Sequence, residues 1–222
     1  MRFLCLHGRG TNAEIFKFQT ANIRAALSED HEFVFVNGNI PARPLAEIAL
    51  GSEFGKERRG FWPAEMRDGE EFRRVYHDMR AFIQKQGPFF GFLVFSEGAS
   101  IASTILIEDI KRHGGSLGIQ CAIFFCAAPP LDLDWERVGE IRLMKPGLGD
   151  TIVDIPTAHI WSEGNHWLPG LGKDLVGMCD KRMSEEVVHN LGHDVPRSRE
   201  DECWRETIRA IERTIEKGKM NS

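Results

Sequence analysis

A serine set among small residues is the first candidate for chemistry in this sequence. Residues 91–100 read GFLVFSEGAS, so Ser96 follows an apolar run and precedes Gly98. The pattern G-x-S-x-G places a nucleophilic serine on a sharp strand-to-helix turn, where the neighbours two residues away must be small. Gly98 meets that requirement, whereas Val94 stands where the pattern has its first glycine. The stretch predicts either an activated serine with one altered support, fitted by a small residue on the facing strand, or an ordinary strand end.

A histidine that could act as the base follows later in the chain. In HNLGHDVPR (189–197), His193 comes after Gly192 on a predicted loop before the last helix. A neighbouring base activates a serine by accepting its proton. His189 lies four residues earlier, a spacing that suits a metal pair on a helix face, but Gly192 and Pro196 predict a loop and no third ligand cluster is evident. We therefore expect no metal and no cofactor.

The first apolar run leads into a glycine-rich turn, HGRGTNA (7–13). The turn matches the dinucleotide-binding pattern G-x-G-x-x-G/A, but that kind of site needs an acidic residue after the second strand, and the sequence there reads FVNG (35–38). The alternative is an oxyanion loop, in which the backbone amides of Arg9 and Glu97 point at the developing negative charge. Their side chains are then free to vary. A simple connecting turn is the remaining alternative, and His7 is expected to be buried, hydrogen-bonded and compatible with shaping the loop.

Short apolar runs alternate with amphipathic stretches along the chain. Runs typical of parallel strands buried on both faces lie at 2–7, 32–36, 91–95, 120–127, 157–161 and 186–189. Apolar residues at helical spacing predict helices at 69–86, at 98–110 and from Trp204 onward. This alternation predicts an α/β fold with a mainly parallel sheet and helices on both faces, in which sites form beyond the carboxyl ends of the strands. A single domain, residues 1–222, fits the length.

Residues 38–68 do not fit this alternation. They are rich in glycine, proline and charge, and they are long for a loop in a compact domain. A lid over the site is one interpretation, and a solvated insertion is the other.

The composition excludes several classes of protein. The net charge is −5 and there is no long basic stripe, so nucleic acid is not an expected partner. No run of eighteen apolar residues is present, and the apolar start is too short for a signal peptide, so neither a membrane span nor a leader is expected. The five cysteines include no C-x-x-C pair, which predicts reduced core thiols in a cytoplasmic protein.

Four segments together resemble the FSH type of serine hydrolases, a group with the α/β-hydrolase fold. They read LCLHGRGTNAEIFKFQT (4–20), GPFFGFLVFSEGASIA (87–102), IPTAHIWSEGN (155–165) and GHDVPR (192–197). The resemblance runs from residue 2 to about residue 212. It implies that Ser96 and His193 form a hydrolytic pair acting on an acyl ester or thioester. The family includes thioesterases and hydrolases that act in trans in polyketide pathways, so an acyl-carrier domain of a synthase is an implied partner.

The triad acid is where the sequence departs from this family. The family pattern I-P-T-x-H-x-x-G-x-x-D starts at Ile155, and its aspartate falls on Asn165. In serine proteases, asparagine in place of this aspartate lowers kcat by about 10⁴. Glu163, two residues earlier on the same predicted turn, is one candidate for a replacement acid, and Asp132 and Asp134 are reserve candidates. The other interpretation is that Asn165 itself orients His193 and the site runs a slow or less demanding reaction.

The sequence therefore predicts a serine hydrolase that cleaves an ester or thioester through an acyl-enzyme, with Asn165 in place of the usual aspartate. Trp62 and Trp161, with Arg9 and Glu97, are the candidate substrate-binding residues. The alternative is a non-hydrolytic protein on the same fold, which either cyclises or transfers an acyl group or only binds a ligand. Val94 and Asn165 are the features that favour this alternative.

Overall fold

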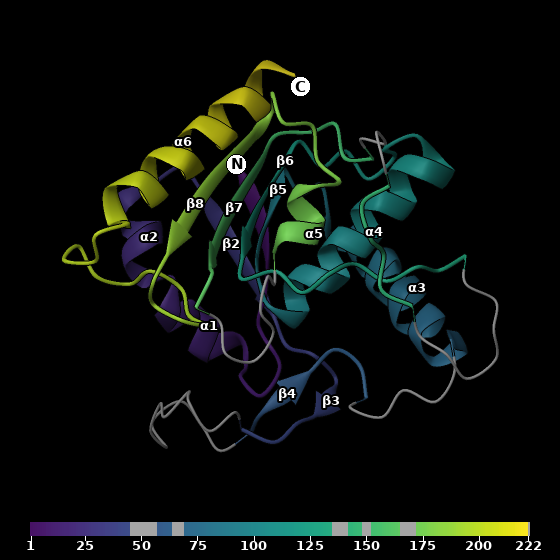
Figure 1. Ribbon diagram of the computed structural model, residues 1–222. Coiled ribbons are helices and arrows are strands. Elements are labelled where there is room, and N and C mark those ends of the chain that lie inside the picture. The colour runs from purple at the N-terminus through teal and green to yellow at the C-terminus, as the bar shows by residue number, and fades with distance from the viewer. Residues whose placement is uncertain (45–56, 64–68, 135–141, 148–151, 165–171, 222) are drawn as a thin grey trace.

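A six-stranded parallel sheet forms the centre of the computed structural model, which describes residues 1–44, 57–63, 69–134, 142–147, 152–164 and 172–221 (Figure 1). Its order is β2-β1-β5-β6-β7-β8, and every neighbouring pair is parallel. The strands are β1 (Arg2–Leu6), β2 (Glu32–Val36), β5 (Gly91–Phe95), β6 (Cys121–Phe125), β7 (Thr157–Ser162) and β8 (Ser184–His189). Each lies within two residues of a predicted apolar run, because parallel strands covered on both faces need apolar side chains on both sides.

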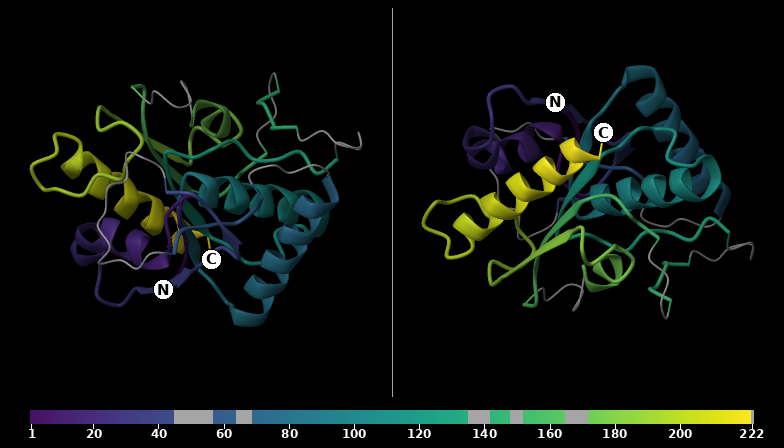
Figure 2. Two further views of the ribbon diagram at one scale, coloured as in Figure 1. Left: turned by 90° about the horizontal axis from the view of Figure 1, so that it is seen from below. Right: turned by 90° about the horizontal axis from the view of Figure 1, so that it is seen from above.

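Helices cover both faces of the sheet (Figure 2). One face carries α1 (Ala13–Gln19), α2 (Ala21–Ala26) and α6 (Trp204–Met220), and the other carries α3 (Gly69–Gln86), α4 (Glu97–His113) and the short α5 (Lys173–Val176). Two apolar cores result, one on each face of the sheet. The predicted α/β architecture is confirmed.

The long helices have recognisable ends. α3 carries Glu70 and Glu71 in its first turn, next to the positive end of the helix dipole. α4 has three basic residues in its last turn and ends at Gly114, whose φ of 60° is the left-handed conformation that glycine adopts most easily. The shorter α1 begins at Asn12, whose side chain accepts a hydrogen bond from the amide of Ile15.

Two short strands within the insertion at 38–68 pair as a small antiparallel hairpin. β3 (Ile40–Pro41) pairs with β4 (Arg59–Gly60), below the carboxyl ends of the main strands in Figure 1. Arg59 also forms a bridge with Thr11, which ties the hairpin to the loop after β1. Residues 45–56 and 64–68 lie outside the described part of the chain, so the lid remains a prediction.

All five cysteines are buried and unpaired, as the sequence predicted. Burial raises the pKa of the Cys121 thiol well above its ordinary value and that of Cys179 to about 12, so both thiols stay neutral near pH 7. Among the residues that the structure describes, no helix combines the length and the apolar character that crossing a bilayer would need.

Three buried histidines should make the fold sensitive to acid. Burial lowers the pKa of His7 and His189 to about 4 and that of His159 to about 3, from an ordinary value near 6.5. Between pH 6.5 and 4 the unfolded chain takes up protons that the folded chain does not, so stability is lost as the pH falls through this range. We expect each histidine to remove about 2 kcal/mol between about pH 7 and pH 4.5.

Urea unfolding at these two pH values measures the effect. The variant His159→Gln should lose less stability on acidification than the wild type. His113→Gln, at the exposed last residue of α4, is the matched control and should leave the acid sensitivity unchanged. Equal losses in His159→Gln and wild type would contradict the prediction.

Candidate active site

Ser96 lies on a strained turn between β5 and α4. Its φ and ψ are 53° and −115°, a combination that non-glycine residues rarely adopt and that persists only where surrounding contacts fix it. Those contacts are present, because the Ser96 amide donates to the carbonyl of Phe125 and the Ser96 carbonyl accepts from the amides of Ala99 and Ser100. The turn projects the serine at the carboxyl edge of the sheet, as a nucleophile elbow requires.

Two glycines, Gly98 in this turn and Gly8 in the loop after β1, allow the turn and the end of β1 to lie close together. A Cβ atom on Gly98 would lie 2.4 Å from the carbonyl oxygen of Leu6, and one on Gly8 would lie 2.7 Å from the ring of Phe95. Both distances are shorter than any ordinary contact. Gly98 is therefore required by the backbone of β1, which explains its place in the motif.

Val94 is accommodated differently from the prediction. Its partners on the neighbouring strands are Leu6 and Phe124, so no small residue faces it across the sheet. It is fully buried in the core cluster that also contains Ala99 and Ala102 of α4. The small residues in this core come from the helix and, in Ala122, from β6, and the elbow keeps its geometry with a valine at position 94.

His193 reaches the serine from the loop after β8. Its Nε2 lies 2.9 Å from the Ser96 Oγ, a normal hydrogen-bond distance, although the residues are 97 positions apart. A serine hydroxyl that donates to Nε2 leaves the ring proton on Nδ1. The imidazole also packs on the Phe95 ring, at 5.0 Å between ring centroids. The predicted nucleophile and base are thus in contact.

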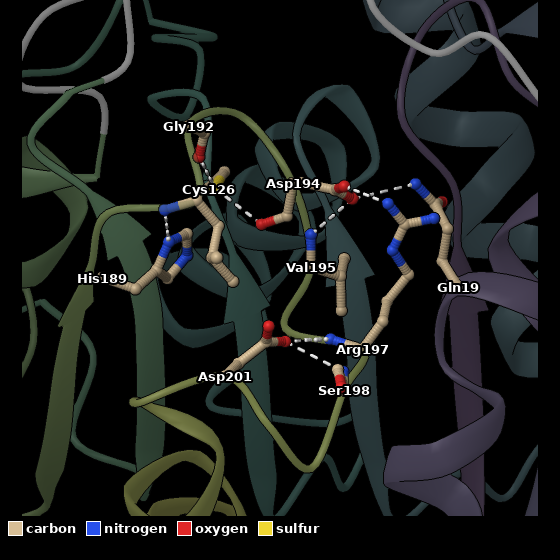
Figure 3. A network of polar contacts seen from close by, with 10 residues as sticks. Gln19, Cys126, His189, Gly192, Asp194, Val195, Arg197, Ser198 and Asp201 are labelled. Atoms are coloured by element: carbon tan, nitrogen blue, oxygen red, sulfur yellow. Dashed lines mark hydrogen bonds and ion pairs between the residues drawn. The ribbon is translucent and has the colours of Figure 1, made fainter.

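Polar contacts fix the loop that carries His193 (Figure 3). The Asp194 carboxylate accepts hydrogen bonds from the amide of Val195 and the guanidinium of Arg197, at 2.8 and 2.5 Å. Farther along, Asp201 accepts from the amides of Arg197 and Ser198, at 3.0 and 2.9 Å. These bonds stabilise the turn on which the imidazole sits.

Cys126, which directly follows β6, contacts the same loop. Its Sγ lies 3.5 Å from the carbonyl oxygen of Asp194 and 3.9 Å from that of Gly192 (Figure 3). Burial raises the pKa of this thiol to about 12, so it remains a neutral donor. The sequence predicted only a core cysteine, because nothing in its neighbourhood along the chain indicates that the His193 loop folds back onto it.

The loop after β1 is organised by His7. Its Nδ1 lies 2.8 Å from the carbonyl oxygen of Gly8, and its Nε2 accepts from the amide of Gly38 at 3.0 Å. The hydroxyl of Thr11 donates to the same Gly8 carbonyl at 2.6 Å. Because carbonyl and amide point in opposite directions across a trans peptide, fixing this carbonyl also fixes the direction of the Arg9 amide. Both expectations for His7, buried and loop-shaping, agree with these contacts.

The side chains of Arg9 and Glu97 are not free to vary, in contrast to the prediction. Arg9 Nη1 lies 2.5 Å from Glu97 Oε1, and the Glu97 side chain is only 5% exposed. Burial raises the pKa of Glu97, whereas Arg9 and hydrogen bonds from Phe61 and Trp62 act in the opposite direction. Sequence reasoning missed the pair because it considered only the backbone role of each residue. Within the described part of the chain, neither backbone amide donates a hydrogen bond to another residue.

The candidate acids are directed elsewhere. Glu163 is 69% exposed and lies 3.6 Å from the ammonium of Lys173, so the structure does not bring it to His193. Asp132 lies 3.8 Å from Arg142, and Asp134 pairs with Arg112 in the last turn of α4, at the opposite end of that helix from Ser96. Asn165 lies outside the described residues. Glu163 as the replacement acid therefore stays a prediction, and its position beside Lys173 and solvent does not favour it.

The variant Glu163→Gln should consequently hydrolyse esters at the wild-type rate, within about twofold, since an exposed ion pair contributes little. The measurement is kcat/KM on a short-chain nitrophenyl ester. Asp174→Asn, in the first turn of the nearby α5, removes the same charge and is the matched control. A tenfold loss confined to Glu163→Gln would support the replacement-acid hypothesis.

The two tryptophans have different surroundings. Trp62 is partly buried, packs edge-on against Phe72 at 5.5 Å and accepts a hydrogen bond from Arg9 on its carbonyl oxygen. Trp161 is 3% exposed, and its indole N–H donates to Glu186 at 2.8 Å. Trp62 therefore lies next to the loop after β1, whereas the described contacts of Trp161 are those of a packed core residue. Among the described residues, no group of three His, Cys, Asp or Glu could hold a metal ion.

Known proteins resemble this chain in both sequence and fold. The chain is 29% identical to "Esterase FPY3" of Fusarium mangiferae over 98% of each protein, and 27% identical to "Esterase alnB" of Emericella nidulans over 90% of this chain and 92% of that protein. In fold it resembles SOBER1 of Arabidopsis thaliana, with a TM-score of 0.61, 11% identity and 98% of each chain covered. A Bacillus cereus carboxylesterase gives a TM-score of 0.59 at 13% identity, covering 97% of this chain and 88% of that one.

The family follows from a match along nearly the whole chain. The sequence model described as serine hydrolase (FSH1) matches residues 1–203, which include both Ser96 and His193. The solved structures agree with an α/β-hydrolase fold, with its mostly parallel sheet between two layers of helices. The protein is therefore a hydrolytic enzyme, and it belongs to the FSH1 family of serine hydrolases.

Proposed function

We propose that the protein hydrolyses an acyl ester or thioester through a covalent intermediate on Ser96. The observation that carries this proposal is the contact of 2.9 Å between His193 Nε2 and the Ser96 hydroxyl on the strained turn. In the first step the serine oxygen bonds to the substrate carbonyl carbon, and its proton passes to His193. The leaving alcohol or thiol takes this proton as the bond to the acyl group breaks, and water then releases the acid by the same route.

The negative charge that develops on the substrate oxygen must be stabilised by hydrogen-bond donors. The backbone amides of Arg9 and Glu97 are our proposed pair, because neither is used within the described part of the chain and both flank the serine. The positive end of α4, a helix of 17 residues that begins directly after Ser96, favours the same charge. Asn165 is proposed to orient His193 through its side-chain amide, from the family pattern alone.

An asparagine at that position favours an activated substrate. Its amide oxygen can accept a hydrogen bond from the Nδ1–H of His193, but it brings no negative charge to stabilise the imidazolium. Thioesters and aryl esters have better leaving groups than alkyl esters, so they depend less on this charge. The family includes thioesterases and hydrolases of polyketide pathways, and we propose the release of a polyketide or acyl chain, from a free ester or from an acyl-carrier domain, as the activity.

Turnover measurements test this proposal. A short-chain nitrophenyl ester and an acyl thioester of a small thiol should both be hydrolysed, with the acid detected as product. If the product of the thioester is instead a cyclised or transferred acyl group, the second candidate function applies, in which positioning of an internal nucleophile replaces water. If neither compound is turned over and Ser96 is not modified, the hydrolytic proposal fails.

A further inference from the structure

The Arg9–Glu97 ion pair connects three segments that are far apart in the sequence. Arg9 belongs to the loop after β1, and Glu97 is the first residue of α4. Arg9 Nη1 donates both to Glu97 Oε1 at 2.5 Å and to the carbonyl oxygen of Trp62 at 2.7 Å. The second carboxylate oxygen of Glu97 accepts from the amide of Phe61 at 3.0 Å. The pair thereby fastens the turn at residues 60–62 to the elbow.

The turn at residues 60–62 approaches the ion pair as closely as backbone can. A Cβ atom on Gly60 would lie 2.9 Å from Arg9 Nη1 and 3.0 Å from Glu97 Oε2. Phe61 is buried, and its ring lies against the imidazole of His7 at 4.9 Å between centroids. A side chain at position 60 would therefore make the ends of these two side chains shift, and the glycine lets the hairpin lie against the undisturbed pair.

The same two residues are the proposed oxyanion donors. Their side chains are joined by one short contact, so the side-chain geometry restrains the distance between their backbone amides. A site with two donors depends on such restraint, because donors held in place before the reaction need no reorganisation when the charge appears. A neutral pair of side chains would give a weaker hydrogen bond at this point, since bonds between charged groups are shorter and stronger.

We propose that the Arg9–Glu97 pair is a clamp that positions the two oxyanion amides and holds the turn at residues 60–62 beside them as a wall of the site. The inference rests on the proposed function, since it assigns the amides to the oxyanion. Arg9 and Glu97 act here through their own backbone groups, so their side chains are positioning groups. The wall brings Trp62, whose carbonyl the clamp holds, next to the reacting centre.

Three variants test the clamp. Arg9→Gln leaves the Glu97 carboxylate buried without its cation. Glu97→Gln keeps one acceptor oxygen for Arg9, but it removes the charge and turns an NH2 group toward the Phe61 amide. The double variant removes both charges. The readouts are the second-order rate of Ser96 modification by a fluorophosphonate, and kcat and KM for a short nitrophenyl ester. Arg182→Gln is the matched control, because it removes an arginine that is 88% exposed and lies two residues before β8.

We expect Arg9→Gln to lower the modification rate and kcat together by about 10- to 100-fold, less than the loss of a whole oxyanion donor, with KM changed by less than about threefold. Glu97→Gln should lose less than about fivefold, because its amide can still bond to Arg9. The double variant should regain activity relative to Arg9→Gln, since the lone buried charge is gone. Arg182→Gln should match the wild type.

Modification of Arg9→Gln at the wild-type rate would overturn the clamp, even if its melting temperature falls, because a purely structural pair would give that result. Independent effects of the two substitutions, with no recovery in the double variant, would also overturn it. If Arg9→Gln does not fold, the test rests on the double variant. A Ser96 modification rate equal to that of the wild type would overturn the clamp. A modification rate at least threefold lower than that of the wild type would support it. Failure of the proposed function is visible separately, because the wild type would then give no Ser96 adduct.

Discussion

Ser96→Ala should form no covalent adduct with a fluorophosphonate and should lose ester hydrolysis by at least about 10³-fold, with its fold intact. The adduct requires the serine oxygen as nucleophile, and that oxygen lies 2.9 Å from Nε2 of His193, the proposed base. Stability should not fall, because the turn is held by backbone bonds of residue 96 that an alanine retains. Intact mass before and after exposure to the reagent, on wild type and variant, measures the result directly.

The matched control for this variant is Ser103→Ala. Ser103 is a buried serine within α4, and its hydroxyl donates to the carbonyl of Ser100 one turn earlier. This variant should be modified as fast as the wild type. Persistent turnover in folded Ser96→Ala would rule out the acyl-enzyme mechanism. A wild type that stays unmodified would leave the non-hydrolytic alternative as the better account of Val94 and Asn165.

Asn165→Asp should increase hydrolysis, by about 10²- to 10⁴-fold for an ester with a poor leaving group. The family pattern has aspartate at this position, and its negative charge stabilises the imidazolium that forms when His193 takes the serine proton. The gain should be smaller for an activated thioester, which needs less help from the base. Measuring kcat/KM for an alkyl ester and a thioester on both proteins gives the two ratios.

Asn190→Asp supplies the control for added charge. Asn190 is exposed and lies three residues before His193, so the substitution introduces the same carboxylate near the loop but not at the pattern position. It should change either rate by less than about threefold. If Asn165→Asp brings no gain while Ser96 remains reactive, the asparagine does not limit the reaction, and the base is supported by other groups.

The features that the sequence predicted are those set by local patterns. The six main strands are continuous apolar runs, and α3 matches the predicted range 69–86 because apolar residues recur along it at helical spacing. The Ser96–His193 pair was predictable because both lie in motifs of recognisable composition. The short α1 and α2, with seven and six residues, were not predicted, since helices of that length depend on tertiary contacts more than on their own pattern.

The features that the sequence did not predict are contacts between distant side chains. Arg9 and Glu97 are 88 residues apart, and no spacing rule joins them. Glu163 is two residues from the expected acid position, but the path of its loop decides which way the carboxylate points, and it points toward Lys173. Cys126 contacts the His193 loop only because β6 ends beneath that loop in the folded protein.

The all-parallel sheet also affects how this enzyme folds. Parallel neighbours cannot be joined by tight hairpins, so each pairing must wait for a long crossover to close, and the pair β1–β5 joins segments about 90 residues apart. Chains dominated by such distant contacts fold slowly, because the entropy of closing each loop is lost before the contacts form. Ser96 follows β5 and His193 follows β8, so the two residues meet only when the neighbouring strands β5, β6, β7 and β8 are paired. The reactivity of Ser96 can therefore be used to measure how much of the chain has reached the native topology.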